Sequence, residues 1–378
     1  MKILIVSDAW HPQVNGVVRT LQATERELQA MGHAIRVHGP DPNLWHTVAM
    51  PSYPSIKLEF LGRMRLQRVW NDFEPDFIHI ATEGPLGWAA RNLCLAKGRP
   101  FTTSYHTRFP EYIAARMMPG LRKATRVIAY AALRRFHAPA SAVMVATSSI
   151  ERDLKRRKFR HIVHWSRGVD TALFAPHKKS TDVYAELPRP VLLSVGRVSV
   201  EKNLRAFLDC KVPGSKIVIG DGPDLESLKA EYPDAHFLGV KEGEELARHF
   251  AAADIFVFPS TTDTFGLVLL EACAAGLRIA SYPAPGPADI FAPEDASAFA
   301  AIDDDLERAI HRAMTLSDDR SLPRRFAEGF SWEACTRVFY DHLQASTPKA
   351  VKRITRFRNW MGRWWQRALA LTVRRWHS

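Results

Sequence analysis

Short apolar runs alternate with amphipathic stretches along the first 170 residues of the chain. Residues 2–7 form an apolar run that ends in a polar loop, and residues 17–31 then show apolar side chains at helical spacing, with Gly32 as the stop. Further runs rich in branched and aromatic residues follow at 35–38, 77–80, 101–105 and 142–146, separated by helix-like stretches such as 88–96 and 125–136. Strands that alternate with helices predict a mainly parallel sheet covered by helices on both faces.

The same pattern starts again after a proline-containing stretch at 176–190. Residues 191–196 form the first new apolar run, and the next ones lie at 216–219, 236–238, 255–258 and 278–281. The fold class is therefore predicted as α/β, with two doubly wound, Rossmann-like domains joined near residues 172–188. Such a pair predicts a ligand site in the cleft between the carboxyl ends of its two sheets.

The composition agrees with two ordinary globular domains. The 378 residues are 46% hydrophobic and 24% charged, which excludes wholesale disorder. No apolar run approaches the roughly 18 residues that span a bilayer, and the amino terminus lacks a signal-peptide profile. We therefore expect neither a transmembrane span nor secretion by that route. The four cysteines lack Cys-x-x-Cys spacing, so we expect reduced packing residues rather than a zinc site or disulfides: Cys94, Cys210, Cys273 and Cys335.

Most of the net positive charge lies at the carboxyl terminus. Of the net charge of +12, nine Lys and Arg side chains lie in residues 349–378 with no acid among them, which leaves +3 for residues 1–348. Apolar residues there recur at helical spacing opposite the cations, with Trp at the edges. This pattern predicts a cationic amphipathic helix in an anionic membrane surface. A terminal helix docked on the protein's own core and a nucleic-acid-binding arm are the alternatives. The basic stretch 116–135, with Met117, Met118, Leu121 and Ile128, could share that face.

Three loops at predicted strand ends have chemically equipped side chains. The loop at 8–18 contains Gly16, which would let backbone amides approach a phosphate, although a tight turn also requires such a glycine. The loop at 196–203 places Arg197 and Lys202 five residues apart, a phosphate-binding pair or a solvated basic loop. Asp263 and Glu271 stand eight positions apart, and carboxylates bind sugar hydroxyls well. A solvent-facing Glu271 is the alternative.

These residues resemble motifs of the family-4 retaining glycosyltransferases of the GT-B fold. The resemblance covers nearly all of residues 1–345 and includes, in family order, Asn15-Gly16-Val17, residues 167–170, 196–203 and 220–223, and the acidic pair, whose first Glu is Asp263 here. It implies an acceptor domain at 1–174, a nucleotide-sugar domain at 175–330 and a helix at 331–348 that crosses back to the first domain. The basic tail at 349–378, predicted from its charge pattern, follows these parts.

The resemblance also implies a role for each site residue. Arg197 and Lys202 would hold the donor diphosphate and stabilise its leaving charge, and Glu271 would bind the ribose hydroxyls. Asp263 would orient the donor sugar with the backbone around Phe265, Gly266 and Leu267. Gly16 would approach the β-phosphate, and His106 would lie close to the transferred sugar. The residues assigned to catalysis are Arg197, Lys202, His106 and Asp263.

The implied reaction moves a hexose from a UDP-sugar to a lipid hydroxyl with retained anomeric configuration and without a metal or other cofactor. Glucose is the first candidate sugar, followed by galactose and glucuronate, and diacylglycerol is the candidate acceptor. We expect a peripheral enzyme on the cytoplasmic face of the inner membrane, with no nucleic-acid partner. A GDP-mannose-dependent mannosyltransferase acting on phosphatidylinositol or a glycan is the nearest alternative. A non-catalytic nucleotide-sugar sensor and a nucleotide-sugar epimerase are alternatives of other classes.

Overall fold

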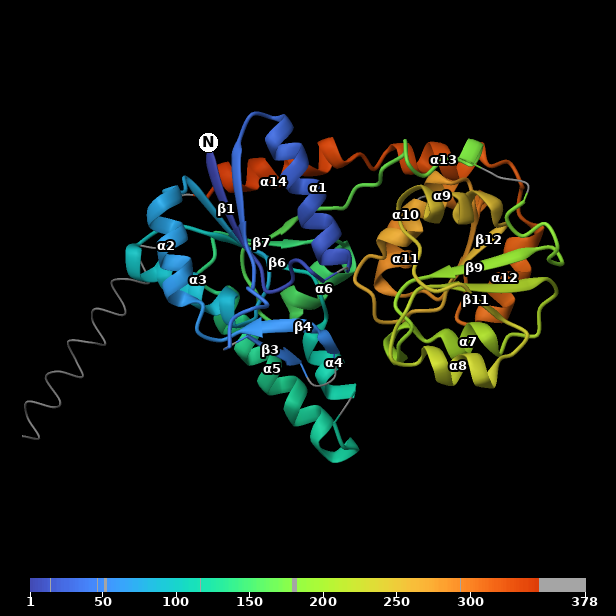
Figure 1. Cartoon of the computed structure of the whole chain (residues 1–378), viewed down its shortest axis with the longest axis horizontal. Coiled ribbons are helices and arrows are strands. Elements are labelled where there is room, and N and C mark those ends of the chain that lie inside the picture. Colours follow the sequence, from blue (N-terminus) through green and yellow to red (C-terminus); the bar gives the residue numbers. More distant parts are fainter. Residues whose placement is uncertain are drawn as a thin grey trace, which may run out of the picture.

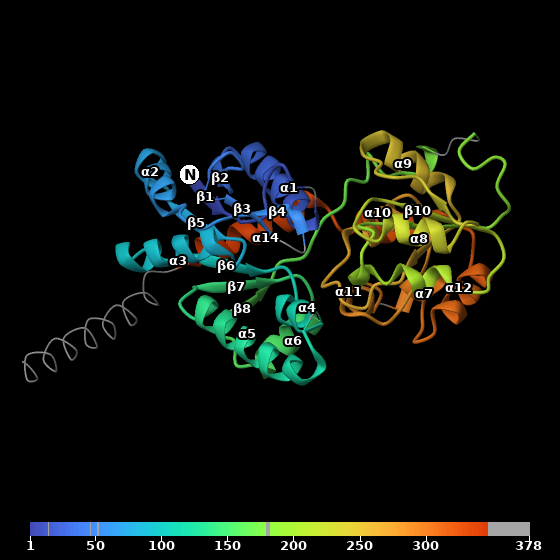
Figure 2. The same ribbon diagram turned by 60° about the horizontal axis from the view of Figure 1, so that its bottom comes forward.

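The computed structural model describes residues 1–13, 15–45, 47–50, 53–115, 117–178, 182–292 and 294–346. The predicted tail at 349–378 lies outside the described residues. Two α/β halves lie side by side, each with a parallel sheet between layers of helices (Figures 1 and 2). The predicted fold class of two Rossmann-like domains is confirmed.

The first sheet has six parallel strands in the order β2-β1-β5-β6-β7-β8. Its strands are β1 (Lys2–Val6), β2 (Ala34–His38), β5 (Phe77–Ile80), β6 (Thr102–Tyr105), β7 (Ala142–Val145) and β8 (Ile162–His164). A separate antiparallel pair consists of β3 (Thr47–Met50) and β4 (Tyr53–Glu59). The chain order reverses between β1 and β5, where doubly wound sheets bind their ligands.

Helices cover both faces of the first sheet. They are α1 (Gly16–Ala30), α2 (Arg63–Phe73), α3 (Pro85–Lys97), α4 (Phe109–Ala115), α5 (Arg122–His137), α6 (Ser148–Arg156) and the last helix, α14 (Trp332–Gln344), with a short 3-10 turn, η1 (Pro119–Leu121). Alternation along β1 divides the core: Leu4 packs toward α2, α3 and α5, whereas Ile5 packs toward α1 and α14.

The second sheet repeats this design in the order β11-β10-β9-β12-β13-β14, again with all strands parallel. Its strands are β9 (Val191–Val195), β10 (Ser215–Ile219), β11 (His236–Phe237), β12 (Ile255–Phe258), β13 (Arg278–Ser281) and β14 (Ala300–Ile302). The chain order reverses between β9 and β12, so the loops that follow these two strands lie at the equivalent edge of the second sheet.

The helices of the second half divide into two layers as well. They are α7 (Leu204–Leu208), α8 (Leu225–Glu231), α9 (Gly243–Ala252), α10 (Leu267–Ala274), α11 (Pro285–Ile290), α12 (Leu306–Thr315) and α13 (Ser321–Glu328). Short 3-10 turns lie at η2 (Pro176–Lys178), η3 (Val200–Lys202) and η4 (Glu294–Ala298). Leu193 packs toward α9 and α10 on one face of the sheet, and Leu192 packs toward α7 and α12 on the other.

The chain crosses between the halves twice, and the two crossings touch. Val169 and Ser331 form a parallel bridge, and the Val169 amide donates to the Phe330 carbonyl at 2.9 Å. After the second crossing, α14 packs beside α1 and places Phe339, fully buried, in the core of the first half (Figure 1).

Other expectations can be compared with the structure directly. All four cysteines are buried and free, so their interpretation as packing residues is confirmed. Asp305 caps α12 by accepting from the Arg308 amide. Within the part of the chain that the structure describes, no helix has the length and apolar character needed to span a membrane.

Candidate functional site

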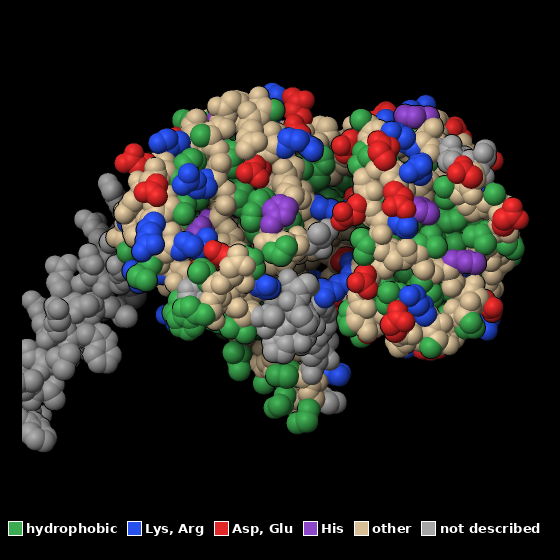
Figure 3. All heavy atoms as spheres, in the orientation of Figure 1, with side chains coloured by type: hydrophobic (Ala, Val, Ile, Leu, Met, Phe, Trp, Pro, Cys, Tyr) green, Lys and Arg blue, Asp and Glu red, His purple; other side chains and the backbone are tan. Residues whose placement is uncertain are grey.

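The predicted site residues follow the carboxyl ends of strands that lie near the centres of the two sheets. Gly16 opens α1 after β1, and His106 follows β6 in the first half. In the second half, Arg197 and Lys202 follow β9, and Asp263 follows β12. The surface is hollowed where the two halves meet (Figure 3).

Lys202 and Asp263 are brought together from two neighbouring loops. The Lys202 Nζ donates to both carboxylate oxygens of Asp263, at 2.9 and 2.8 Å, and both side chains are about three-quarters buried. The same loops are joined by Asn203, whose Nδ2 donates to the Pro259 carbonyl at 3.2 Å. The cation is therefore held on a braced loop rather than on a freely moving side chain.

Arg197 is half-buried and lies on the same loop as Lys202, at 196–203. The neighbouring segment 220–223 supports this loop by backbone contact: the Val198 amide donates to the Asp221 carbonyl at 2.9 Å. A Cβ at Gly220, where φ is +142°, would lie 1.9 Å from the Gly196 carbonyl oxygen. The glycines in this motif therefore allow two loops to touch, which positions Arg197.

Glu271 lies inside α10 and is only 8% exposed, so the alternative of a solvent-facing side chain is wrong. Its Oε1 lies 3.4 Å from Nη1 of Arg19, which comes from α1 of the other half. Its Oε2 is buried and has no partner among the described residues. Burial raises the pKa of Glu271 and the Arg19 guanidinium opposes that rise. One carboxylate oxygen is thus held across the interface, while the other is an unused hydrogen-bond acceptor within the described part of the chain.

His106 is held from behind by a buried arginine. The Arg167 Nη2 lies 3.1 Å from the His106 Nδ1, and because a guanidinium only donates, Nδ1 accepts and the proton of the neutral ring lies on Nε2. Burial and the Arg167 charge lower the pKa of His106 well below its ordinary value. Its Nε2 is buried without a partner among the described residues. The Nε2–H of the ring is therefore available to donate a hydrogen bond to a ligand.

The start of α10 contacts the first half through its first helical residue, Leu267. Gly266 adopts φ +89° immediately before the helix, a conformation that a side chain would strain. A Cβ on Gly16 would lie 3.8 Å from a methyl of Leu267, so the amino ends of α1 and α10 approach each other. Phe265, which precedes Gly266, is 6% exposed and packs in the core of the second half. Two helix amino termini therefore face the same interdomain region, a favourable environment for anions.

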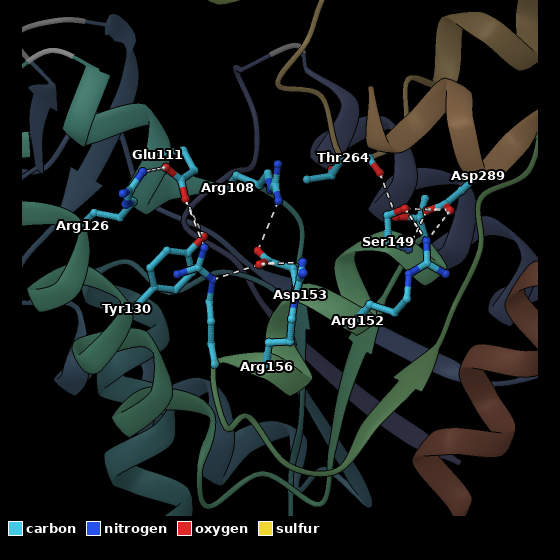
Figure 4. A network of polar contacts seen from close by, with 12 residues as sticks. Arg108, Glu111, Arg126, Tyr130, Ser149, Arg152, Asp153, Arg156, Thr264 and Asp289 are labelled. Carbon is cyan, nitrogen blue, oxygen red and sulfur yellow. Dashed lines mark hydrogen bonds and ion pairs between the residues drawn. The ribbon is translucent and has the colours of Figure 1, made fainter. Parts of the chain in front are cut away.

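Direct hydrogen bonds join the two halves around this region. The Thr264 Oγ1 donates to the His106 carbonyl at 2.6 Å, which ties the Asp263 loop to the loop after β6. Further along, the amide and hydroxyl of Ser149 donate to Asp289 at 2.7 and 2.9 Å, so a carboxylate on α11 caps α6 (Figure 4). These contacts hold the loops from the two sheets against each other.

Asp8 is a second buried carboxylate, at the end of β1. It accepts from the Leu86 amide at 2.9 Å, the Gly87 amide at 3.2 Å and the Thr82 hydroxyl at 2.9 Å, so it caps α3 from another segment. Burial nevertheless raises its pKa to about 6. Asp8 therefore fixes the start of the loop that leads to Gly16.

Arg19, Arg167 and Asp8 had not been predicted as site residues. Arg167 was visible only as part of the motif at 167–170, and Arg19 and Asp8 only as members of the loop and helix around Gly16. Their roles depend on contacts between segments far apart in sequence. Among the described residues, no group of three or more His, Cys, Asp or Glu side chains is arranged to hold a metal ion.

Comparison with known families and proteins agrees with this architecture. Residues 14–173 match the model of Glycosyltransferase Family 4, and residues 179–329 match that of Glycosyl transferases group 1. The chain is 26% identical over 369 residues to a GDP-mannose-dependent alpha-mannosyltransferase of Mycobacterium tuberculosis, covering 91% of this chain and 97% of that protein.

Two further similarities bear on the fold and the substrate. An alpha-monoglucosyldiacylglycerol synthase of Streptococcus pneumoniae is 27% identical over 359 residues, covering 84% of this chain and 79% of that protein. The solved sucrose-phosphate synthase of Thermosynechococcus elongatus superposes with a TM-score of 0.71 at 20% identity, covering 92% of this chain and all of that chain. At that identity the structural likeness concerns the fold alone.

Proposed function

The chain belongs to the family-4 glycosyltransferases of the GT-B fold, and on that premise we propose that it transfers a hexose from a UDP-sugar to a hydroxyl of a membrane lipid. Glucose is the proposed sugar and diacylglycerol the proposed acceptor, in keeping with the similarity to a monoglucosyldiacylglycerol synthase. We propose that the enzyme works as a peripheral protein on the cytoplasmic face of the inner membrane.

The observation on which the lipid acceptor rests is the exposed tip of the first half, which we define as Met117, Met118, Leu121, Val127 and Ile128. These apolar side chains are between 38% and 70% exposed. They lie where η1 and α5 project from the body of the molecule, and hydrophobic side chains gather there (Figures 1 and 3). Exposed basic neighbours accompany the tip: Arg122, Lys123 and Arg126. Apolar side chains edged by cations suit an anionic bilayer surface.

The donor would bind between the loops that follow β1 and β6 in the first half and those that follow β9 and β12 in the second. Arg197 and Lys202 supply positive charge for a diphosphate, the open Oε2 of Glu271 suits a ribose hydroxyl, and Asp263 beside Lys202 suits a sugar hydroxyl. His106 would donate from Nε2 to the transferred sugar or to the acceptor. Positive charge fixed before the reaction stabilises the leaving diphosphate more than mobile water does.

We propose retention of the anomeric configuration by attack on the face that the diphosphate leaves. In that mechanism the departing diphosphate takes the acceptor proton, so no side-chain nucleophile is needed. Positioning by Glu271, Asp263 and His106 and charge stabilisation by Arg197 and Lys202 would then supply the catalysis. We propose that no metal takes part.

A GDP-mannose-dependent mannosyltransferase is the second candidate, because the similarity to a mycobacterial enzyme of that description covers nearly the whole of both chains. The fold and the facing loops suit either nucleotide.

Purified full-length enzyme should be incubated with vesicles of diacylglycerol and phosphatidylinositol and with UDP-glucose or GDP-mannose, followed by mass spectrometry of the lipids. A hexosyl-diacylglycerol formed from UDP-glucose, with an α-linkage by NMR, supports the proposal. A mannosylated lipid formed only from GDP-mannose supports the second candidate. Absence of any lipid product from either donor, with donor binding intact, would leave the non-catalytic sensor in its place.

A further inference from the structure

Arg108 is a partly buried cation that the proposed donor chemistry does not use. It lies between β6 and α4, two residues after His106, and its side chain is 25% exposed. Its Nη2 donates to Asp153 Oδ2 at 3.2 Å, whereas its Nε is buried without a partner in the described part of the chain. A buried N–H without an acceptor is unfavourable, so a native structure retains one where a ligand or water completes it.

The network around Arg108 has more positive than negative charge. Asp153 forms ion pairs with Arg108, Arg156 and Arg157 (Figure 4). Glu111 forms ion pairs with Arg157 and Arg126. Among the described residues, the cations of this network are Arg108, Arg126, Arg156 and Arg157, against the two carboxylates. Two positive charges are therefore left uncompensated within the network.

Arg108 also lies between the two regions that the proposed reaction must connect. On one side, the carbonyl of His106 accepts from Thr264, the residue that follows Asp263, so Arg108 is close to the proposed sugar position. In Figure 4, Arg108 and Thr264 extend toward the same interdomain space. On the other side, α4 begins directly after Arg108 and leads to the exposed tip.

We propose that Arg108 binds an anionic group, a carboxylate or a phosphate, at the junction of donor and acceptor. This inference rests on the proposed transfer of a hexose to a membrane lipid, and it replaces one of the two neutral reactants, glucose or diacylglycerol, by an anionic one. The anion has two possible sources: the C6 carboxylate of a uronosyl donor, or the phosphate of an anionic lipid acceptor. Either anion would accept a hydrogen bond from the Arg108 Nε and would neutralise part of the excess positive charge.

The test compares matched substrates that differ by one charge. One arm uses UDP-glucuronate and UDP-glucose with diacylglycerol vesicles, and the other uses phosphatidylinositol and diacylglycerol as acceptors with a single donor. Wild type is compared with Arg108→Gln, Arg108→Lys and the control Arg156→Gln, which removes a 78%-exposed guanidinium from the same carboxylate.

Loss of one charge-assisted hydrogen bond predicts a fall of about 10- to 100-fold in kcat/KM for the anionic substrate in Arg108→Gln, with less than about threefold change for the neutral one. Arg108→Lys should recover part of the loss, and Arg156→Gln should change neither. A selective loss in the donor arm assigns the site to a uronosyl carboxylate, and one in the acceptor arm assigns it to a phosphate.

Equal effects of Arg108→Gln on charged and neutral substrates, or a wild type indifferent to charge in both arms, would overturn the inference and leave the proposed function standing. Calorimetric binding of UDP-glucuronate against UDP-glucose, and of inositol phosphate against inositol, keeps the two claims separate. Preferential binding of an anion that depends on Arg108 supports the site even if lipid turnover, and with it the proposed function, fails. If Arg108→Gln does not fold, the charge preference of Arg108→Lys decides, because lysine retains a partner for Asp153.

Discussion

Lys202 donates to both carboxylate oxygens of Asp263, at 2.9 and 2.8 Å, and so joins the cation assigned to the donor diphosphate to the carboxylate assigned to the donor sugar. A diphosphate that binds Lys202 therefore competes with Asp263 for the same ammonium group. A sugar hydroxyl that donates to Asp263 would compensate for that loss. Binding of the two parts of the donor is expected to be coupled through this pair.

Arg197→Ala and Lys202→Ala are each expected to reduce turnover about a hundredfold or more without unfolding the protein, because each removes positive charge facing the leaving group. Steady-state kinetics and thermal melting measure the two effects. Lys229→Ala, which removes an exposed cation from a surface pair with Glu226, is the control. Activity near the wild-type value in both site variants would refute the donor-site assignment.

Asp263→Glu is expected to change the ratio of kcat/KM between UDP-glucose and UDP-galactose, because the added methylene moves the carboxylate relative to the sugar. It should also shift the donor KM, since the longer side chain changes the pairing with Lys202. Competition between the two donors in one reaction measures the ratio directly. An unaltered ratio would show that Asp263 serves only to hold Lys202.

Arg19→Ala is expected to make donor binding more sensitive to acid. Burial raises the pKa of Glu271 and Arg19 opposes that rise, so removing Arg19 raises the pKa further. If ribose binding uses the ionised carboxylate, donor affinity falls as the pH drops, and the fall should begin at a higher pH in the variant. Each unit by which the pKa of Glu271 rises would move the midpoint of this fall up by about one pH unit, which is about tenfold in proton concentration.

The measurement for Arg19 is the donor dissociation constant, by calorimetry, across neutral and mildly acidic pH. Arg26→Ala is a matched control, since Arg26 lies on the same helix with a 62%-exposed side chain and pairs with neighbouring Glu27. Superimposable pH profiles for wild type and Arg19→Ala would separate the Arg19 contact from donor binding.

Asp8 is expected to make the free energy of unfolding fall as the pH rises from about 4 to about 6. Its folded pKa is about 6 against 3.8 for the ordinary group, so the folded state holds the proton more tightly in that window. The part of the free energy of unfolding that is lost over this range is on the order of 3 kcal/mol. Asp8→Asn does not titrate, and its difference from wild type in denaturant unfolding should change across this range. A constant difference would contradict the raised pKa.

Met118→Glu and Ile128→Glu are each expected to weaken binding to anionic vesicles about tenfold, since each replaces an apolar side chain at the exposed tip by a charge. Co-sedimentation with vesicles of graded anionic content measures the effect. Val240→Glu, at an exposed apolar position of the second half, is the control. Equal losses in all three variants would point to a general effect of charge.

Deletion of residues 349–378 should release the protein from acidic vesicles, because the nine cations of that segment each contribute about 1 kcal/mol near an anionic surface. Raising the salt concentration should weaken wild-type binding in the same way. Donor binding should survive, because the proposed donor residues all precede residue 345. Vesicle binding that is unaffected by the deletion would remove the segment from the membrane proposal.

The strands and the longer helices were predictable because their signals are local. The apolar run at 77–80 and the amphipathic stretch at 17–31 correspond to β5 and α1 within a residue or two. Short or less regular elements were missed: the β3–β4 pair, β8 and β14. Each of these has at most seven residues, and a short run shows too little periodicity to identify a strand.

Pairwise contacts in the site could not be predicted from the sequence alone. The Lys202–Asp263 pair joins loops 61 residues apart, and the contact of Arg19 with Glu271 spans 252 residues and two sheets. Motif spacing identified both members of the first contact but only Glu271 of the second, and which side chains pair is set by how the loops and sheets face each other. The burial of Glu271 follows from the apolar residues around it on α10, yet its pairing with Arg19 does not.

The bridge between Val169 and Ser331 makes the second half an insertion within the first. Because α14 returns to the core around Phe339, the first half is discontinuous in sequence and encloses the segment between its two junctions. A chimaera that exchanged everything after residue 170 with a relative would replace α14 and leave the residues that pack on it with a foreign partner. Exchange of residues 170–330 alone keeps α14 with the core in which it packs, so this segment is the natural unit to exchange between enzymes of this family.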